Sequence, residues 1–317
     1  MILFALRRFI GFAATLFVAA LVIFWLLDLL PGDPAQFILG INATPESVMR
    51  LRAQMGLDAP AHERFAGWVW GMLQGDFGTS YTQRAPVADL IWGRLGVTLP
   101  LSVLAMVISM VVGLPLGILA ARQRGKALDT ATMVTAQAGV AIPNFWFGML
   151  LSLVFAVMLR WLPPGGFTPW DEDPSAAFRG LILPSLALAL PQASILARVM
   201  RTALVDVTSQ DYIRTARAKG LTMSEAVWRH GVRNALLPVL TILGLQFAYL
   251  VAGTIIVENV FYLPGLGRLI FTAIQERDLI LVRGATIILI LAVTVTMLLT
   301  DIAYALVDPR LRERSAP

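Results

Sequence analysis

Six long apolar stretches alternate with polar segments along the chain. They lie at about 9–30, 99–121, 132–159, 181–200, 236–257 and 284–307. Each is close to the roughly 20 residues that a helix needs to cross the hydrocarbon core of a bilayer. The pattern therefore predicts an all-α membrane protein with six transmembrane helices.

The first apolar stretch follows Arg7 and Arg8, as the apolar core of a signal peptide would. It is longer than the roughly 7 to 15 residues of such a core, so we expect it to stay in the protein as the first span. The resulting organisation is an N-terminus and first span at 1–30, an external loop region at 31–98, and a core domain at 99–317. That core contains the other five spans.

Several prolines lie inside the predicted spans or at their edges: Pro115, Pro143, Pro184 and Pro191. A proline removes one helical hydrogen bond and clashes with the preceding turn, so it bends or breaks a helix. Bilayers tolerate this where neighbouring helices cover the freed carbonyls. We therefore expect bends at these positions and a packed bundle.

The composition agrees with a membrane protein and excludes several other classes. Hydrophobic residues make up 57% of the chain, charged residues 14%, and the mean hydropathy is +0.74, values outside the range of soluble domains. The chain has no cysteine, which excludes disulfides, thiolate metal sites and a cysteine nucleophile.

The basic residues predict the orientation. With six spans both termini lie on one side of the membrane, and 15 of the 25 basic residues belong to that side, in the segments 7–8, 122–126, 198–233 and 310–314. Because basic loops stay in the cytoplasm, we expect a multi-pass protein of the bacterial inner membrane with both termini cytoplasmic. Topology also accounts for the pI near 10.1, so we expect no nucleic-acid partner.

The predicted cytoplasmic loop 201–235 contains the segment DYIRTARAKGL at 211–221. Strong helix formers surround Ala216, and Gly220 is placed to end that helix in a left-handed conformation. Thr222 and Glu225 have the spacing of a capping box that starts a second helix, and Met223, Ala226, Val227 and His230 fall on one face of it. One interpretation is a basic loop that fixes orientation and touches lipid phosphates. The order of helix, glycine and helix favours a knob that docks on a soluble partner.

This loop and other motifs resemble one family of transport proteins. The motifs are LPGDPA at 30–35, GLDAP at 56–60, GDFGTS at 75–80, TLPLSV at 98–103, IPNFW at 142–146, RHGVRNALLPVLTILGLQ at 229–246, ENVFYLPGLGR at 258–268 and VDPRLR at 307–312. In this order and spacing, over essentially the whole chain, they are similar to binding-protein-dependent ABC importer permeases of the dipeptide, oligopeptide and nickel branch.

The resemblance implies a six-helix permease bundle whose cytoplasmic loop inserts a coupling helix into a groove on an ATPase subunit. The coupling positions carried over are Asp211, Tyr212, Arg214, Thr215, Ala216, Arg217, Ala218, Lys219 and Gly220. The wider superfamily has Glu-Ala-Ala before that glycine, where this chain has Arg214, Thr215 and Ala216. This departure leaves open which side chain makes each contact.

The resemblance also implies partners and a cargo. The partners are a second homologous permease, two ATP-binding cassette ATPase subunits, an extracytoplasmic substrate-binding protein and the lipid bilayer. The expected cargo is a dipeptide or oligopeptide, and nickel or glutathione import is the alternative within the family.

The sequence has no pattern typical of catalysis in this chain. It has no G-x-x-x-x-G-K-[ST] phosphate loop, so ATP and magnesium are expected on the partner subunits and not here. The two histidines, His62 and His230, are predicted on opposite sides of the membrane, so we expect no catalytic or metal site. A passive channel or secondary transporter remains the alternative of a different class. Asn144 and Gln246 are candidate pore-lining residues, because polar groups inside spans are costly without a function.

Overall fold

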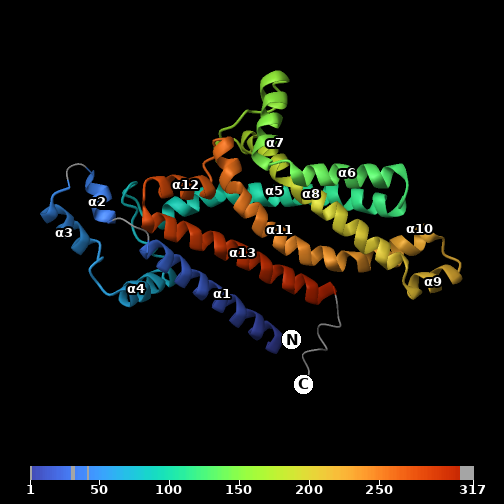
Figure 1. Ribbon diagram of the computed structural model, residues 1–317, viewed down its shortest axis with the longest axis horizontal. Helices are drawn as coiled ribbons and strands as arrows, with labels where there is room; N and C mark the ends of the chain where they lie inside the picture. The colour runs from blue at the N-terminus through green and yellow to red at the C-terminus, as the bar shows by residue number, and fades with distance from the viewer. Residues whose placement is uncertain (1, 30–32, 41–42, 308–317) are drawn as a thin grey trace. The chain divides into compact units, whose positions relative to one another are not determined.

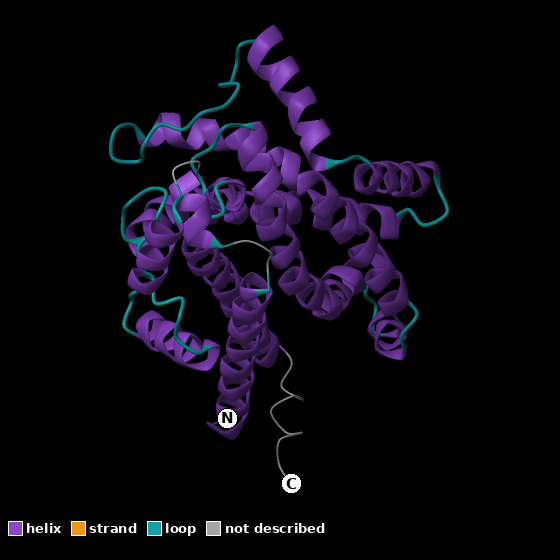
Figure 2. Ribbon diagram, turned by 60° about the vertical axis from the view of Figure 1, so that its left-hand side comes forward, coloured by secondary structure: helices purple, strands orange, loops and turns teal. Residues whose placement is uncertain are grey.

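The computed structural model describes residues 2–29, 33–40 and 43–307. Helices joined by loops make up this part of the chain, with no strand among the described residues (Figure 2). Their bounds are α1 Ile2–Asp28, α2 Pro34–Leu39, α3 Pro45–Gln54, α4 Ala61–Leu73, α5 Val87–Arg122, α6 Ala127–Ala141, α7 Asn144–Leu151, η2 Ser152–Met158, α8 Pro174–Thr208, α9 Asp211–Ala218, α10 Met223–Ala226, η3 Val227–Gly231, α11 Val232–Val260, α12 Leu266–Gln275 and α13 Leu279–Val307. The VDPRLR motif lies outside the described residues except for Val307.

Five continuous helical segments are long and apolar enough to cross a membrane. They are Leu6–Asp28, Val87–Arg122, Pro174–Thr208, Met223–Val260 and Leu279–Ile302. A sixth span is formed only if the bent pair Ala127–Ala141 and Asn144–Met158 is counted as one. The prediction of six spans is thus confirmed in number on that count, but the third span is not a continuous helix.

The third span breaks at Pro143, where the two helical parts meet at 100°. Ile142 is extended there, with ψ at 124°, and Pro143 has no N–H to continue the helical ladder. Asn144 is the first residue of the new helix, and its Oδ1 accepts a hydrogen bond from the adjacent Phe145 N–H at 2.8 Å. Figure 1 shows α7 turning steeply away from α6.

The helices continue without a break through the other prolines, and a bend at these positions stays a prediction. Pro115 lies inside α5, and Pro184 and Pro191 lie inside α8, a continuous helix of 35 residues. Neighbouring helices cover α8 over most of its length, and 72% of its most apolar window is buried. That packing compensates for the lost hydrogen bonds.

The chain forms two compact units. Among the described residues, the first contains 99–263 and 296–307, and the second contains 2–98 and 264–295 apart from the residues not described.

In the first unit α8 is the central helix, and α6, α7 and α11 pack on it. Its C-terminal half contributes Leu196, Met200 and Leu204 to a buried cluster with Val227 and Val239. This cluster joins the end of α8 to the start of the segment that becomes α11.

In the second unit α1, α4 and α13 enclose an aromatic group. Phe24 is fully buried, and its ring contacts Phe65 and Trp68 at centroid distances of 5.3 and 6.2 Å. The buried Asp278 carboxylate, just before α13, accepts hydrogen bonds from Ser80 and Thr82. These bonds fix the segment after α4 against the start of α13.

Candidate functional site

The segment 211–220 forms a short helix, α9, beyond the end of α8 (Figure 1). The loop assigned to 201–235 is shorter than predicted, because α8 continues to Thr208 and the helical chain resumes at Met223. Leu204 lies beyond the apolar run predicted as a span, and it is still buried in the core of the first unit. This packing favours a helical conformation for the last turns of α8.

The α9 helix is amphipathic and presents its polar face outward. Ile213 and Ala216 are 1% and 7% exposed, and they pack with Ala226 of α10 and with Val207 and Leu221. The other predicted coupling side chains in α9 and its C-cap are exposed: Asp211, Tyr212, Arg214, Thr215, Arg217, Ala218 and Lys219. Ala216 therefore faces its own chain, whereas the remaining positions are open to a partner.

The turn after α9 has the predicted glycine geometry. Gly220 has φ at +94°, a left-handed conformation that L side chains rarely adopt. The Lys219, Gly220 and Leu221 N–H groups donate to the carbonyls of Thr215, Arg217 and Ala216, which closes the helix.

The capping box at the start of α10 is also confirmed. The Thr222 N–H donates to Glu225 Oε2 at 2.8 Å, and the Glu225 N–H donates to Thr222 Oγ1 at 3.3 Å. The predicted buried face is narrower than expected: Ala226 and Val227 are buried, while Met223 and His230 are exposed. Val227 packs against α8 and Ala226 packs against α9, whereas the side chains of Met223 and His230 lie outside these contacts.

The basic residues of α9 are available to a partner. Arg214 contacts Asp211 at 3.3 Å, and their side chains are 75% and 94% exposed, so water screens this pair strongly. Arg217 and Lys219 are exposed as well. The surface of α9 is thus a cationic ridge held in place by two buried apolar side chains.

Polar contacts join the elements around α10 and the start of α6. Arg122 at the end of α5 donates to Ser224 Oγ of α10 at 2.9 Å, and Arg201 of α8 forms an ion pair with Asp129 in the first turn of α6. Asp129 was not singled out from the sequence, because its partner lies 72 residues further along the chain. An acidic residue just after the basic link 122–126 is a local signal.

The two candidate pore-lining residues have different surroundings. Gln246 of α11 is 2% exposed, and its Nε2 donates to the Gln192 carbonyl of α8 at 3.0 Å. Asn144 is half-buried at the start of α7, near Gly253 of α11. The contact of Gln246 fastens two helices, as polar groups inside membranes often do. A pore-lining role for either residue stays a prediction.

The chain matches two models of one protein family. Residues 113–313 match the model described as the binding-protein-dependent transport system inner membrane component, and residues 1–102 match its N-terminal counterpart.

Curated relatives cover nearly the full chain. A putative peptide transport system permease protein of Brucella abortus (strain 2308) is 41% identical over 307 residues, which are 97% of this chain and 98% of the relative. The glutathione transport system permease protein GsiC of Salmonella typhi is 40% identical over 312 residues, 98% of this chain and 99% of the relative.

A solved structure shares the fold. The MetNI methionine ABC transporter in an inward facing conformation aligns with a TM-score of 0.56 at 18% identity, over 68% of this chain and 94% of the aligned chain. At that identity the likeness concerns the fold alone.

Proposed function

The chain belongs to the binding-protein-dependent transport system inner membrane component family and is an ABC importer permease, and on that premise we propose that α9 is its coupling helix. The observation that supports this proposal is the geometry of α9. Two buried side chains hold it on the ends of α8 and α10, while its cationic face remains uncovered. Such a ridge suits a groove with acidic walls on a soluble partner.

The coupling proposal gives the ridge a mechanical connection to the spans. Ile213 contacts Val207 in the last turn of α8, and α10 continues without interruption through η3 into α11. A displacement of α9 is therefore passed to two spans at once. A packed helix pair of this kind moves as a body, because its interior does not deform continuously.

The energetic logic is a shift between two populations. An ATPase pair that closes on ATP binds one conformation of the permease more tightly, and the difference in binding free energy favours outward access over inward access. This chain supplies one half of the pathway and a second homologous permease supplies the other. ATP and magnesium belong to two separate ATPase subunits.

The orientation of the chain follows from the same proposal. A coupling helix has to face the cytoplasm. Counting the bent pair as one, four proposed crossings precede α9 and two follow it, so an even number separates it from each terminus. The basic residues of α9 and of the link 122–126 support the same orientation. Both termini are then on the cytoplasmic side of the inner membrane.

Charge reversal on α9 tests the coupling. Arg214→Glu with Arg217→Glu removes the cationic ridge without touching Ile213 or Ala216. We expect normal membrane insertion and ATPase activity that no longer drives uptake, measured side by side in reconstituted vesicles. Arg124→Glu is the matched control, an exposed arginine on the short link before α6. Uptake that is unchanged by the double reversal would overturn the assignment.

A substitution that alters the backbone at the end of α9 tests the coupling proposal a second time. Gly220→Pro cannot adopt φ at +94° and removes the N–H that donates to Arg217 at 3.0 Å. It should misplace α9 and uncouple uptake in the same way as the charge reversal. If the chain inserts and uptake persists, α9 does not transmit ATPase closure.

We propose peptides as the cargo, with glutathione as the second candidate. The support is the identity of 41% with a protein named for peptide transport and of 40% with one named for glutathione transport. A thermal melt of the cognate substrate-binding protein with dipeptides, oligopeptides, glutathione and a nickel chelate separates them. The true ligand at ~100 times its dissociation constant adds about 2.7 kcal/mol of stability. A shift with nickel alone would contradict peptide import and leave the coupling proposal untouched.

A further inference from the structure

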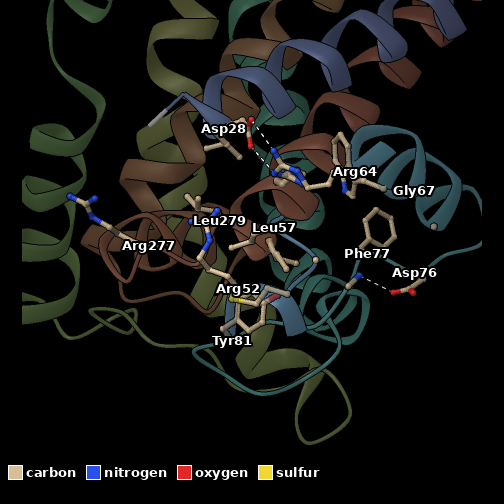
Figure 3. Close-up of a pocket in the computed structure, with 18 of the residues that line it drawn as sticks. Asp28, Arg52, Leu57, Arg64, Gly67, Asp76, Phe77, Tyr81, Arg277 and Leu279 are labelled. Carbon is tan, nitrogen blue, oxygen red and sulfur yellow. Dashed lines mark hydrogen bonds and ion pairs between the residues drawn. The ribbon is translucent and has the colours of Figure 1, made fainter. Parts of the chain in front are cut away.

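The second unit encloses a cavity of about 740 Å³ lined by four arginines. Its wall includes Asp28, at the end of the span Leu6–Asp28, and Arg283, one turn into the span Leu279–Ile302. Because both residues lie where a span leaves the hydrocarbon core, the cavity lies at the depth of lipid headgroups. Figure 3 shows the cavity, with Arg52, Arg64 and Arg277 contributed by different segments.

Arg64 and Arg52 have carboxylate partners. Arg64 donates to both oxygens of Asp28, at 2.8 and 3.1 Å, which Figure 3 marks with dashed lines. Arg52 contacts Asp33 at 2.8 Å and Asp58 at 3.1 Å. In these ion pairs the carboxylates neutralise the positive charges of Arg64 and Arg52.

Arg283 has no such partner among the described residues. Its guanidinium carbon lies 4.6 Å from the centre of the Phe24 ring and 5.2 Å from that of Trp68. Its Nε atom is buried without a hydrogen-bond acceptor in the described part of the chain, and so is Trp68 Nε1. Two donors on neighbouring cavity-lining side chains therefore lack an acceptor.

The ring contacts do not compensate for this burial. A cation over an aromatic face gains roughly 0.5 to 2 kcal/mol, whereas withdrawing a guanidinium from water costs several kcal/mol. Arg64 lies on the same Phe24 ring, at 5.7 Å from its centre, and Asp28 is the carboxylate paired with it. This inner group of Arg64, Arg283 and Asp28 thus carries a net charge of about +1. A monoanion with several oxygen acceptors would compensate it.

We propose that this cavity binds the phosphate group of an anionic membrane phospholipid, with Arg283 as its main ligand. Phosphate oxygens match the fork of guanidinium donors, and a phosphodiester carries the single negative charge that the inner group lacks. The position at the end of two spans places the site where such headgroups are found. The lipid would fasten α1 to α13, and this role does not depend on the coupling proposed for α9.

The rest of the lining suits a polar headgroup. Tyr81 lies on the cavity wall, and burial, together with the nearby Asp278 carboxylate, raises the pKa of its hydroxyl. It therefore stays a neutral hydrogen-bond donor at physiological pH. The carboxylates of Asp33 and Asp76 also line the cavity and can accept from the hydroxyls of a glycerol headgroup.

The site can be tested on the intact transporter purified through a tag on this chain. Short-chain phosphatidylglycerol is titrated in detergent while the unfolding midpoint is followed, and native mass spectrometry counts the bound lipid. We expect saturable stabilisation of the wild type and at least ~10-fold weaker binding by Arg283→Gln, because truncating one member of a hydrogen-bonded charge pair removes that much affinity or more. Arg94→Gln, on α5 outside the cavity lining, should bind like the wild type.

A second variant moves the affinity in the opposite direction. Asp28→Asn releases Arg64 from its partner and adds positive charge, so it should bind phosphatidylglycerol more tightly than the wild type. This prediction holds even if Arg283→Gln does not fold. An unchanged response in Asp28→Asn, or an Arg283→Gln response equal to that of the wild type, would overturn the proposal.

Two further arms identify the source of the phosphate. Phosphatidylcholine of the same chain length should stabilise far less, and inorganic phosphate should produce no shift at the same concentration. An equal response to inorganic phosphate would overturn the lipid as the ligand and leave a site for free phosphate. An equal response to phosphatidylcholine would overturn the requirement for an anionic lipid.

Discussion

Arg201 of α8 donates hydrogen bonds to both carboxylate oxygens of Asp129 in α6. Its Nη2 lies 2.7 Å from Oδ2, and its Nε donates to Oδ1. The Gly125 N–H donates to the same carboxylate at 2.9 Å, and Asp129 is 4% exposed. The pair joins the start of α6 to the part of α8 that leads into α9. The ion pair therefore links two spans, and its carboxylate is largely shielded from water.

Breaking this pair should destabilise the chain. Asp129→Asn leaves the Arg201 charge partly buried without its partner, and such losses cost about 3 to 5 kcal/mol in buried sites, somewhat less here because Arg201 is 26% exposed. We expect a lower unfolding midpoint in detergent. The double variant with Arg201→Gln should lose less than the sum of the single variants. Additive losses would show that the two groups do not interact.

The close approach of α5 to α8 depends on two glycines. A Cβ at Gly113 would lie 2.5 Å from the Ala193 carbonyl oxygen, and one at Gly117 would lie 2.5 Å from that of Ala197. This spacing of small residues allows helix backbones to approach in membranes. Gly113→Leu should therefore reduce stability by more than the roughly 1 to 3 kcal/mol of ordinary overpacking, because a backbone atom blocks the new side chain.

The same helix offers a matched control for that substitution. Gly93 also lies in α5, and no atom lies within 4 Å of a Cβ built there. Gly93→Leu should leave the unfolding midpoint within the range of ordinary surface changes, roughly ±0.5 kcal/mol. Equal losses at the two positions would contradict the packing of α5 on α8.

Ile213 is the larger of the two buried side chains that hold α9 in place. Ile213 is 1% exposed, and Ile213→Ala should cost about 2 to 4 kcal/mol of local stability, mostly by releasing α9 from α8 and α10. Limited proteolysis should then cut near Gly220 faster than in the wild type. Ala218→Ser, on the exposed side of α9, is the control and should be cut at the wild-type rate. If Ile213→Ala is cut near Gly220 no faster than the wild type, contacts other than those of Ile213 hold α9.

Acid should loosen the contact between α2 and α3. Burial opposes ionisation of Asp33, but hydrogen bonds from Arg52 and the Ala35 N–H outweigh it and hold its pKa below the ordinary value of 3.8. The folded pKa is the lower one, so the stabilisation is present above 3.8 and is lost as the pH falls through the folded value. Amide exchange in α2, corrected for intrinsic rates, should rise over that acid range. In Asp33→Asn it should be high at every pH, and a flat wild-type profile would contradict the contact.

Local chemistry made the cytoplasmic segment predictable. Gly220 adopts the left-handed conformation and Thr222 forms its capping box with Glu225, because each feature depends on residues within four positions. Long apolar runs predicted the spans for a similar reason, since their length alone matches the bilayer.

Features that depend on contacts between distant parts of the chain could not be predicted from the sequence. Pro143 breaks its span whereas Pro184 and Pro115 lie inside continuous helices, and nothing in the local sequence around these prolines separates the two outcomes. The contact of Gln246 with Gln192 and the ring contacts of Arg283 join residues far apart in the chain, which no local pattern encodes.

The central claim is that α9 docks on an ATPase subunit, and the absence of cysteine from the chain allows a direct test. Thr215→Cys, on the exposed face of α9, carries a photoactivated cross-linker in membranes that hold the assembled transporter. Gln54→Cys, exposed at the end of α3 in the predicted external region, is the control. The account predicts a covalent adduct with the ATPase subunit from position 215 and none from position 54. A transporter that still imports its cargo but gives no ATPase adduct from position 215 would contradict it.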